Sequence, residues 1–366
     1  AAFGGDGGEV CFNPFDSNFI LGESQNGGLV RTTNGGSSWQ NATTGINTGE
    51  SVAWVAPILA HPTISGTFYV ARQRVYRSTN NGGSWTAISA NVNSTSAVRE
   101  MAISKSDPSI MFATSGTQVF KSTDSGLTWT NVTSGLPSRT ITSVSVYPTD
   151  PNLVFLTFSG FSTSKVYKST NGGTNWVSIS GNLPDSPVND IYVHTNNPGT
   201  PNTFFVATDI GIFVTENDGV NWFEISASMP NTVVMHLDYS PGNQMLRAGT
   251  HGRGVYEAFV DFSIPVEMIS FTANQTDKKV VLNWRTATET NNSHFEVERS
   301  ADGVNFTSIV SKNATGDLSS RATYTHGDNM SSFGANYVFY YRLKMVDLDG
   351  KFSYSNVILV RKDGKA

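Results

Sequence analysis

The chain has 366 residues, of which 38% are hydrophobic and only 14% are charged, against about 25% charged residues in ordinary globular chains. Its 34 glycines and its abundant Ser, Thr and Asn favour strands and turns over helices. The net charge of −5 and the lack of long apolar runs argue against a nucleic-acid surface and a membrane span, and the single Cys11 excludes an internal disulfide and a Cys-rich zinc site.

A short motif recurs five times and is the strongest signal in the sequence. It has the form Ser/Thr-x-Asp/Asn-x-Gly-x-x-Trp, and its tryptophans follow one another at intervals of 46, 44, 47 and 46 residues. A fixed period of this size is typical of repeat architectures. The five copies are Thr32–Trp39, Ser78–Trp85, Ser122–Trp129, Ser169–Trp176 and Thr215–Trp222.

Each copy of the motif predicts a hairpin turn held by its own side chains. The Asp or Asn accepts hydrogen bonds from the backbone N–H groups that follow it, and the Gly supplies a positive φ. The Trp then buries a large ring against its surroundings, so we expect Trp129 to be buried and its hairpin to be closed by Asp124. The expected structural residues are Asn34, Trp39, Asn80, Trp85, Asp124, Trp129, Asn171, Trp176, Asn217 and Trp222.

The residues around each motif predict four short antiparallel strands per repeat. In the fourth repeat these are Ile141–Tyr147, Leu153–Thr157, Lys165–Lys168 and a strand that follows Trp176. Four strands in about 46 residues make one propeller blade. The sequence therefore predicts an all-β fold with six visible blades, in which the sixth, from Val233 to Tyr256, lacks the motif.

The motif resembles the Asp-box, or BNR, repeat of sialidases, sortilin-type receptors and xyloglucanase-type glycoside hydrolases. The resemblance implies a β-propeller over residues 1–262. The first residues, Ala1 to Gly8, resemble a link between two blades, which leaves open a propeller truncated at its N-terminus and a larger parent ring.

Residues 263–366 predict a second domain, a β-sandwich of seven strands with Trp284 and Tyr341 in its core. The segments Leu282–Trp284, Phe295–Ser300 and Tyr341–Asp347 resemble the fibronectin-III-like domain of proteins exported by the type IX secretion system. The resemblance implies passage through secretion machinery and a place outside the cell or on its outer surface. Asp347-Leu-Asp-Gly350 predicts a hairpin turn before the last strand.

One segment resembles a catalytic run. Thr208-Asp-Ile-Gly211 is similar to the run that carries a catalytic Asp in xyloglucanase-type hydrolases, but it lacks the second Gly. Asp209 is therefore a candidate catalytic residue. The alternative, which we favour, is a turn-stabilising Asp at the end of a strand. The histidines show no zinc spacing.

A second candidate site follows from alignment of the repeats. Each innermost strand has a polar or turn residue directly before its first apolar residue. These six positions should surround one mouth of the central channel. They are Glu9, Pro57, Glu100, Ser143, Asp190 and His236. A solvated rim is the simpler interpretation. The alternative is a cation or polyol site, with a structural Ca²⁺ held by Glu9, Glu100 and Asp190 and with His236 as the poorer ligand.

The sequence as a whole favours a secreted or cell-surface protein without catalytic activity that binds or presents a glycan or an extracellular protein. No cofactor is expected beyond that Ca²⁺. A polysaccharide-active glycoside hydrolase and a structural component of an extracellular assembly remain the alternatives.

Overall fold

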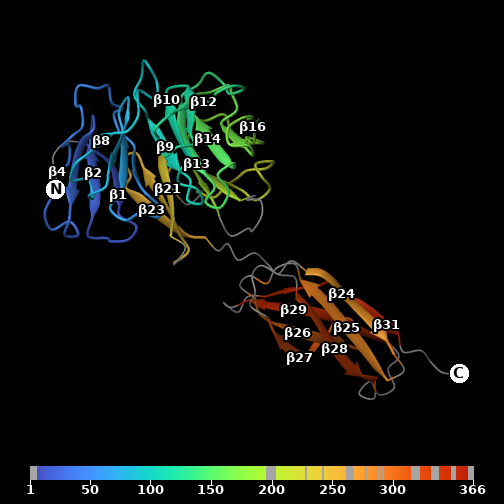
Figure 1. The fold of residues 1–366 in the computed structure, drawn as a ribbon. Coiled ribbons are helices and arrows are strands. Elements are labelled where there is room, and N and C mark those ends of the chain that lie inside the picture. Colours follow the sequence, from blue (N-terminus) through green and yellow to red (C-terminus); the bar gives the residue numbers. More distant parts are fainter. Residues whose placement is uncertain are drawn as a thin grey trace. The chain divides into compact units, whose positions relative to one another are not determined.

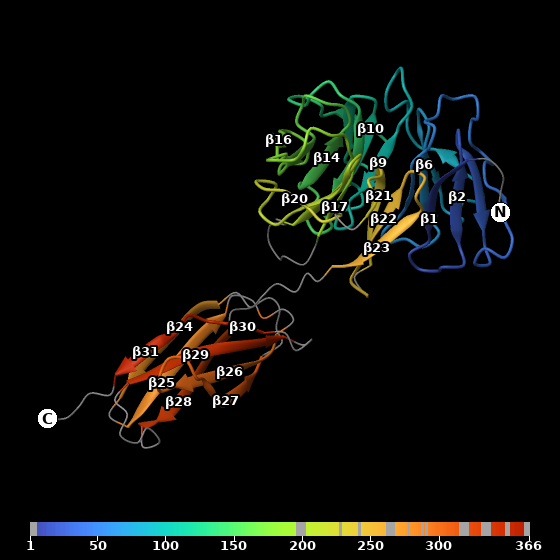
Figure 2. The same cartoon turned by 180° about the vertical axis from the view of Figure 1, so that it is seen from behind.

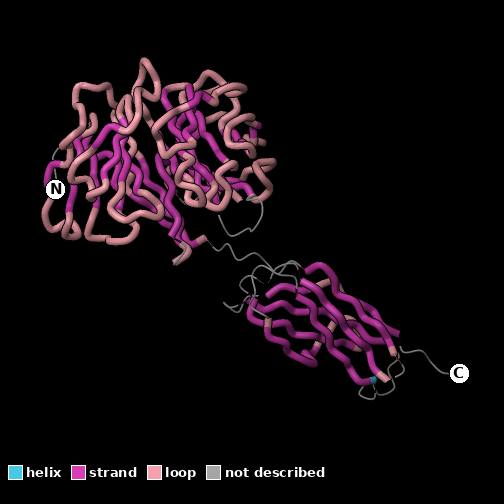
Figure 3. The backbone as a smooth tube through the Cα atoms, in the orientation of Figure 1, coloured by secondary structure: helices cyan, strands magenta, loops and turns pink. Residues whose placement is uncertain are grey.

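The structure, a computed structural model, describes residues 6–194, 203–226, 229–240, 243–260, 268–276, 278–286, 289, 292–314, 322–330, 338–347 and 352–361. The chain divides into two compact units, Ala1–Val260 and Asp261–Ala366. The described residues form antiparallel sheets without an α-helix (Figures 1 and 3). The predicted all-β fold, a propeller followed by a β-sandwich, is confirmed.

The first unit consists of six consecutive sheets, which we call blades 1 to 6 (Figure 2). Blades 1 to 5 have four strands, and blade 6 has three in the described part of the chain. The strands of blades 1 to 3 are β1 (Gly7–Phe12), β2 (Ile20–Ser24), β3 (Gly28–Thr32), β4 (Gln40–Asn41); β5 (Ile58–Ala60), β6 (Phe68–Ala71), β7 (Val75–Ser78), β8 (Thr86–Ala87); β9 (Glu100–Ile103), β10 (Met111–Ser115), β11 (Gln118–Ser122) and β12 (Thr130–Asn131). Those of blades 4 to 6 are β13 (Ile141–Val146), β14 (Val154–Phe158), β15 (Val166–Ser169), β16 (Val177–Ser178); β17 (Val188–Val193), β18 (Phe204–Thr208), β19 (Gly211–Thr215), β20 (Phe223–Glu224); β21 (Val234–Ser240), β22 (Met245–Thr250) and β23 (Val255–Phe259).

The second strands of blades 2 to 5 explain how the blades hold together. Every residue of β6, β10, β14 and β18 is buried, although side chains alternate between the two faces of a strand. Both faces of these sheets are therefore covered by neighbouring blades. The innermost strands of consecutive blades also pack on one another, from β1 on β5 through to β17 on β21.

All five motif turns share one hydrogen-bond pattern. In the third copy, the Ser122 hydroxyl accepts from Gly126 N at 2.9 Å, and Asp124 Oδ1 accepts from Thr128 N at 2.9 Å. The hydrogen bonds from Thr128 lower the pKa of Asp124 to about 2. The motif Gly always has positive φ, and so does the residue before it, including the non-glycine residues Asn81, Ser125 and Asp218. This second left-handed residue was not predicted.

The motif tryptophans join adjacent blades, which the sequence analysis missed. Trp85 and Trp222 are buried, but Trp129 is only half-buried, so the expectation for Trp129 was wrong. Trp129 Nε1 donates to Gly126 O within its own turn, at 3.1 Å. Three other indoles donate to a carbonyl of the preceding blade: Trp85 to Ala42 at 2.7 Å, Trp176 to Val132 at 2.9 Å and Trp222 to Ile179 at 3.0 Å.

The second unit is a β-sandwich. One sheet has the order β24-β25-β28, and the other has β27-β26-β29-β30 with β31 also paired to β29. Trp284 and Tyr341 are fully buried in its core. The last predicted strand is two strands here, and the predicted turn at 348–350 lies outside the described residues. The strands are β24 (Met268–Gln275), β25 (Lys279–Thr286), β26 (Asn292–Ser300), β27 (Thr307–Asn313), β28 (Ala322–Asn329), β29 (Val338–Asp347), β30 (Phe352–Tyr354) and β31 (Ile358–Arg361).

Candidate functional site: the two ends of the channel

The innermost strands β1, β5, β9, β13, β17 and β21 carry different chemistry at their two ends. Polar side chains stand near the start of most of these strands, at the positions that the repeat alignment singled out. An apolar pocket lies at the opposite ends of the first four. We call these regions the polar mouth and the apolar pocket.

Asp190 connects three blades at the polar mouth. Its Oδ1 accepts from the Ser143 hydroxyl at 2.8 Å, and its Oδ2 accepts from Leu237 N at 3.0 Å. Oδ2 also lies 2.7 Å from His236 Nδ1. The predicted positions on β13, β17 and β21 are therefore brought together by one buried carboxylate.

The other two predicted carboxyls lie within electrostatic reach of this pair. The charges of Asp190 and His236 act on both Glu9 and Glu100. Glu9 Oε2 also accepts from Ile58 N at 3.0 Å, just as Asp190 accepts from Leu237 N. In both cases a carboxylate holds the start of the next blade's innermost strand, which gives these residues a structural role.

The polar mouth shifts the protonation of its groups. Burial, the largest cause, raises the pKa of Glu9 to about 7 and that of Glu100 well above its usual range. The hydrogen bond with Asp190 raises the pKa of His236 to about 9. The His236 side chain is still 75% exposed, so it faces the water of the channel and carries a positive charge at neutral pH.

Glu23 belongs to the same region and was not predicted. It is 0% exposed, and its Oε1 accepts from Ala56 N at 2.7 Å and from Gly27 N at 3.1 Å. Burial raises its pKa to about 7. Its sequence signal is an acidic residue inside an otherwise apolar and small strand, Ile20–Ser24.

The polar mouth gives no support to a metal site. Within the described residues, no three His, Cys, Asp or Glu side chains form a group that could hold a metal ion. Asp209, the candidate catalytic residue, lies in the turn between β18 and β19 and accepts from Asn189 Nδ2 at 3.0 Å. The same amide donates to Val234 O at 2.9 Å, so this contact ties the turn to blade 6.

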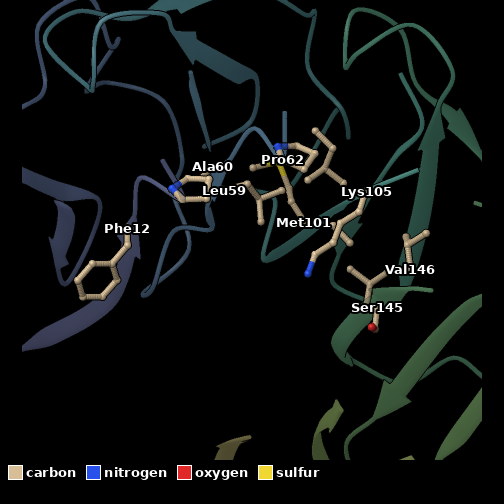
Figure 4. Close-up of a pocket in the computed structure, with 12 residues that line it drawn as sticks. Phe12, Leu59, Ala60, Pro62, Met101, Lys105, Ser145 and Val146 are labelled. Carbon is tan, nitrogen blue, oxygen red and sulfur yellow. The ribbon is translucent and has the colours of Figure 1, made fainter. Parts of the chain in front are cut away.

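The apolar pocket has a volume of about 510 Å³ and lies where the first four innermost strands end (Figure 4). Its lining comes from strands far apart in the sequence, and Lys105 is its only charged member. The lining residues are Phe12, Pro14, Leu59, Ala60, Pro62, Met101, Ala102, Ile103, Lys105, Val144, Ser145 and Val146. The sequence analysis did not predict a pocket there.

The raised carboxyl pKa values predict that the propeller loses stability as pH rises. Between about pH 4.5 and 7, folded Glu9 and Glu23 keep protons that the unfolded chain releases, so the free energy of unfolding falls. His236 has the same sign between about 6.5 and 9. Burial lowers the pKa of His194 to about 4, so this group has the opposite sign between about pH 4 and 6.5 and offsets part of the fall there. Urea unfolding at pH 5, 7 and 8.5 should show this fall, and Glu23→Gln should flatten its lower part. The exposed Glu216→Gln is the control, and a stability that rises across this range would contradict the prediction.

Comparison with known proteins agrees with the fold. Residues 67–248 match the family model described as DUF6242 beta propeller domain. A comparison with curated proteins found no match. Among the described residues, no helix is long and apolar enough to cross a membrane.

Solved structures give the same class of protein, a β-propeller. The chain is similar to YCF48 bound to D1 peptide, with 17% identity and a TM-score of 0.50 over 67% of this chain and 75% of that one. It is also similar to an ancestral GH74 enzyme, with 16% identity and a TM-score of 0.55 over 96% of this chain and 62% of that one. The chain thus spans less than two thirds of the GH74 chain's length, and at these identities the likeness shows the fold alone.

Proposed function

We propose that this protein is a non-catalytic binding propeller that recognises a polypeptide at its apolar pocket. The observation that carries the proposal is the pocket itself, about 510 Å³ with a largely apolar lining. Ligand sites have this size range and this balance of apolar surface with a few polar groups.

The chemistry of the pocket favours one kind of peptide. Leu59, Met101 and Val144 offer surface for an apolar side chain. Lys105 offers a positive charge for a neighbouring acidic side chain or a terminal carboxylate. The YCF48 structure was solved with a bound peptide, which supports the use of this fold for peptide binding as an analogy only.

The proposal includes a place outside the cell. It rests on the resemblance of the repeat to Asp-box propellers and of the second domain to fibronectin-III-like domains of type IX cargo. Detection of the full-length chain in culture medium or on intact cells would support this part, and its recovery with cytoplasmic markers alone would refute it.

The binding proposal is tested with a random peptide library selected on the full chain. Selected peptides should share an apolar residue beside an acidic group, and their affinity should fall at least about tenfold with Ala60→Glu, which places a charge in the apolar lining of the pocket. Ala87→Glu is the matched control, because Ala87 lies half-buried in the same blade outside the pocket. Its affinity should stay within about twofold of the unmodified chain.

Four results would overturn the proposal. Selection without enrichment, or equal affinity of the Ala60→Glu variant, would remove the pocket as the binding site. Glycan binding that is lost in Glu100→Gln would move recognition to the polar mouth. Release of reducing sugar from xyloglucan would make the protein a hydrolase, with Asp209→Asn as the first variant to examine.

A further inference from the structure

Two blade faces differ from all others in the propeller: the face of blade 1 that points away from blade 2, and the face of blade 6 that points away from blade 5. Each innermost strand has one apolar residue directly after its polar-mouth position. In blades 2 to 6 this residue is at most 8% exposed, whereas Val10 in blade 1 is 55% exposed. The five buried equivalents are Ile58, Met101, Val144, Ile191 and Leu237. These residues face the preceding blade, so Val10 shows that this face of blade 1 is uncovered.

The motif glycine of blade 1 gives the same result independently. A Cβ added to Gly82 or Gly219 would lie within 2.5 Å of Leu21 or Ile179 in the preceding blade. Cβ atoms at Gly126 and Gly173 would also contact the preceding blade, at Ile88 and Val132. A Cβ added to Gly36 in blade 1 would meet nothing within 4 Å. Phe12, on the same face, is 56% exposed.

The opposite face of blade 6 is also uncovered, but it is charged. Arg247 pairs with Asp238 on β21 and with Glu257 on β23, at 3.9 and 3.1 Å. The residues at the position of Arg247 in blades 1 to 5 are large, apolar and buried: Leu21, Tyr69, Phe112, Phe155 and Phe205. Val255 on β23 is 67% exposed. Among the described residues, β1 and β21 do not pack on each other as the other neighbouring innermost strands do.

We propose that the space between blades 1 and 6, the seam, is a docking site for a seventh blade of the same repeat type, contributed by polypeptide outside residues 6–260. The five interfaces between neighbouring blades show which kind of sheet would pack on the uncovered face of blade 1. It is a sheet with a large apolar residue at the middle of its second strand. The face of that sheet toward blade 6 must instead be polar. The proposal does not rest on the proposed function.

A second copy of this chain fits the seam less well. Its charged blade 6 face would place Arg247, Asp238 and Glu257 against Val10 and Phe12, and burial of charges against apolar side chains is costly. Pairing of two blade 1 faces would leave the charged face of blade 6 uncovered in both copies.

The test adds a blade to the full chain. A copy of residues 141–187, changed by Val144→Ser and Leu156→Thr so that its face toward blade 6 is polar, is placed directly before Gly7. This junction is chosen because Val188 and Gly7 stand at the same distance before Asp190 and Glu9. The added blade should then join blade 1 as blade 4 joins blade 5. We expect the extended chain to stay monomeric, to unfold at a temperature raised by about 5 °C or more, and to bind less of an apolar dye such as ANS.

Matched variants show whether the gain comes from the seam. Val10→Glu should change the unfolding temperature of the original chain little, since Val10 is exposed, and should abolish the rise in the extended chain. Val220→Glu, at a residue 66% exposed in blade 5, should leave the rise intact. A second extended chain, with residues 188–233 before Gly7 and with Ile191→Ser and Val206→Thr on the face toward blade 6, shows whether a failure is specific to one copied blade.

The proposal is overturned if both extended chains unfold at or below the temperature of the original. It is also overturned if Val10→Glu leaves the rise in place. A concentration-dependent dimer of the original chain that Val10→Glu dissociates would assign the apolar face to a second copy instead.

Discussion

Gly219→Ala is expected to lower the free energy of unfolding of the propeller by ~2–5 kcal/mol. Gly219 has φ +79°, and its added Cβ would lie 2.2 Å from Ile179 O and 2.7 Å from Ile179 Cβ. The left-handed backbone costs about 1–2 kcal/mol for a residue with a side chain, and overpacking a rigid contact costs about 1–3 kcal/mol more. Urea unfolding of the full chain, followed by far-UV circular dichroism, measures the loss.

Gly36→Ala is the matched control for this prediction. Gly36 holds the same motif position in blade 1 with φ +93°, but its added Cβ meets nothing within 4 Å. It should therefore show only the backbone cost, ~1–2 kcal/mol. The difference between the two variants isolates the contact between blades 4 and 5. Equal losses of ~1–2 kcal/mol would mean that this contact adds nothing. Equal and larger losses would mean that Gly36 is packed against a neighbour as well, so that the opening beside blade 1 does not exist in solution.

The propeller and the sandwich could be predicted because their signals are periodic and local. The spacing of Trp39, Trp85, Trp129, Trp176 and Trp222 set the blade length, and the Ser/Thr and Asp/Asn side chains of each motif bond to backbone groups within a few residues. Contacts of this range are fixed by the local sequence. In the second domain, the apolar alternation around Trp284 and Tyr341 located the core in the same way.

What each motif contacts in the neighbouring blade could not be predicted. Trp129 and Trp222 occupy the same motif position, yet the Trp129 indole donates within its own turn and the Trp222 indole donates to Ile179 of the preceding blade. The difference depends on the neighbouring blade's backbone, which no local pattern encodes.

The candidate sites show the same limit. Repeat alignment identified the polar mouth because equivalent positions of successive blades share a height in the ring. It did not show that Asp190 would accept hydrogen bonds from donors on β13, β17 and β21, nor that Glu23 would lie at the same mouth. The apolar pocket combines residues from four blades, each unremarkable in its own segment.

Trp222→Ala is the second variant expected to have a large effect, a loss of ~3–5 kcal/mol, the range for a large aromatic residue removed from a core. Trp222 is 3% exposed, packs in the cluster between blades 4 and 5, and donates its indole N–H to Ile179 O at 3.0 Å. Removing the ring leaves a cavity and an unpaired buried carbonyl, which adds to the loss.

Trp129→Ala is the comparison that tests why Trp222 matters. Trp129 is half-buried and bonds within its own turn, so its loss should be smaller, ~1–3 kcal/mol. Urea unfolding of both variants at one pH gives the two values. If the motif tryptophans act only as staples of their own hairpins, the two losses will be equal. A clearly larger loss at Trp222 means that deep burial and the indole hydrogen bond between blades add to the stability, because of these two tryptophans only Trp222 donates to the preceding blade.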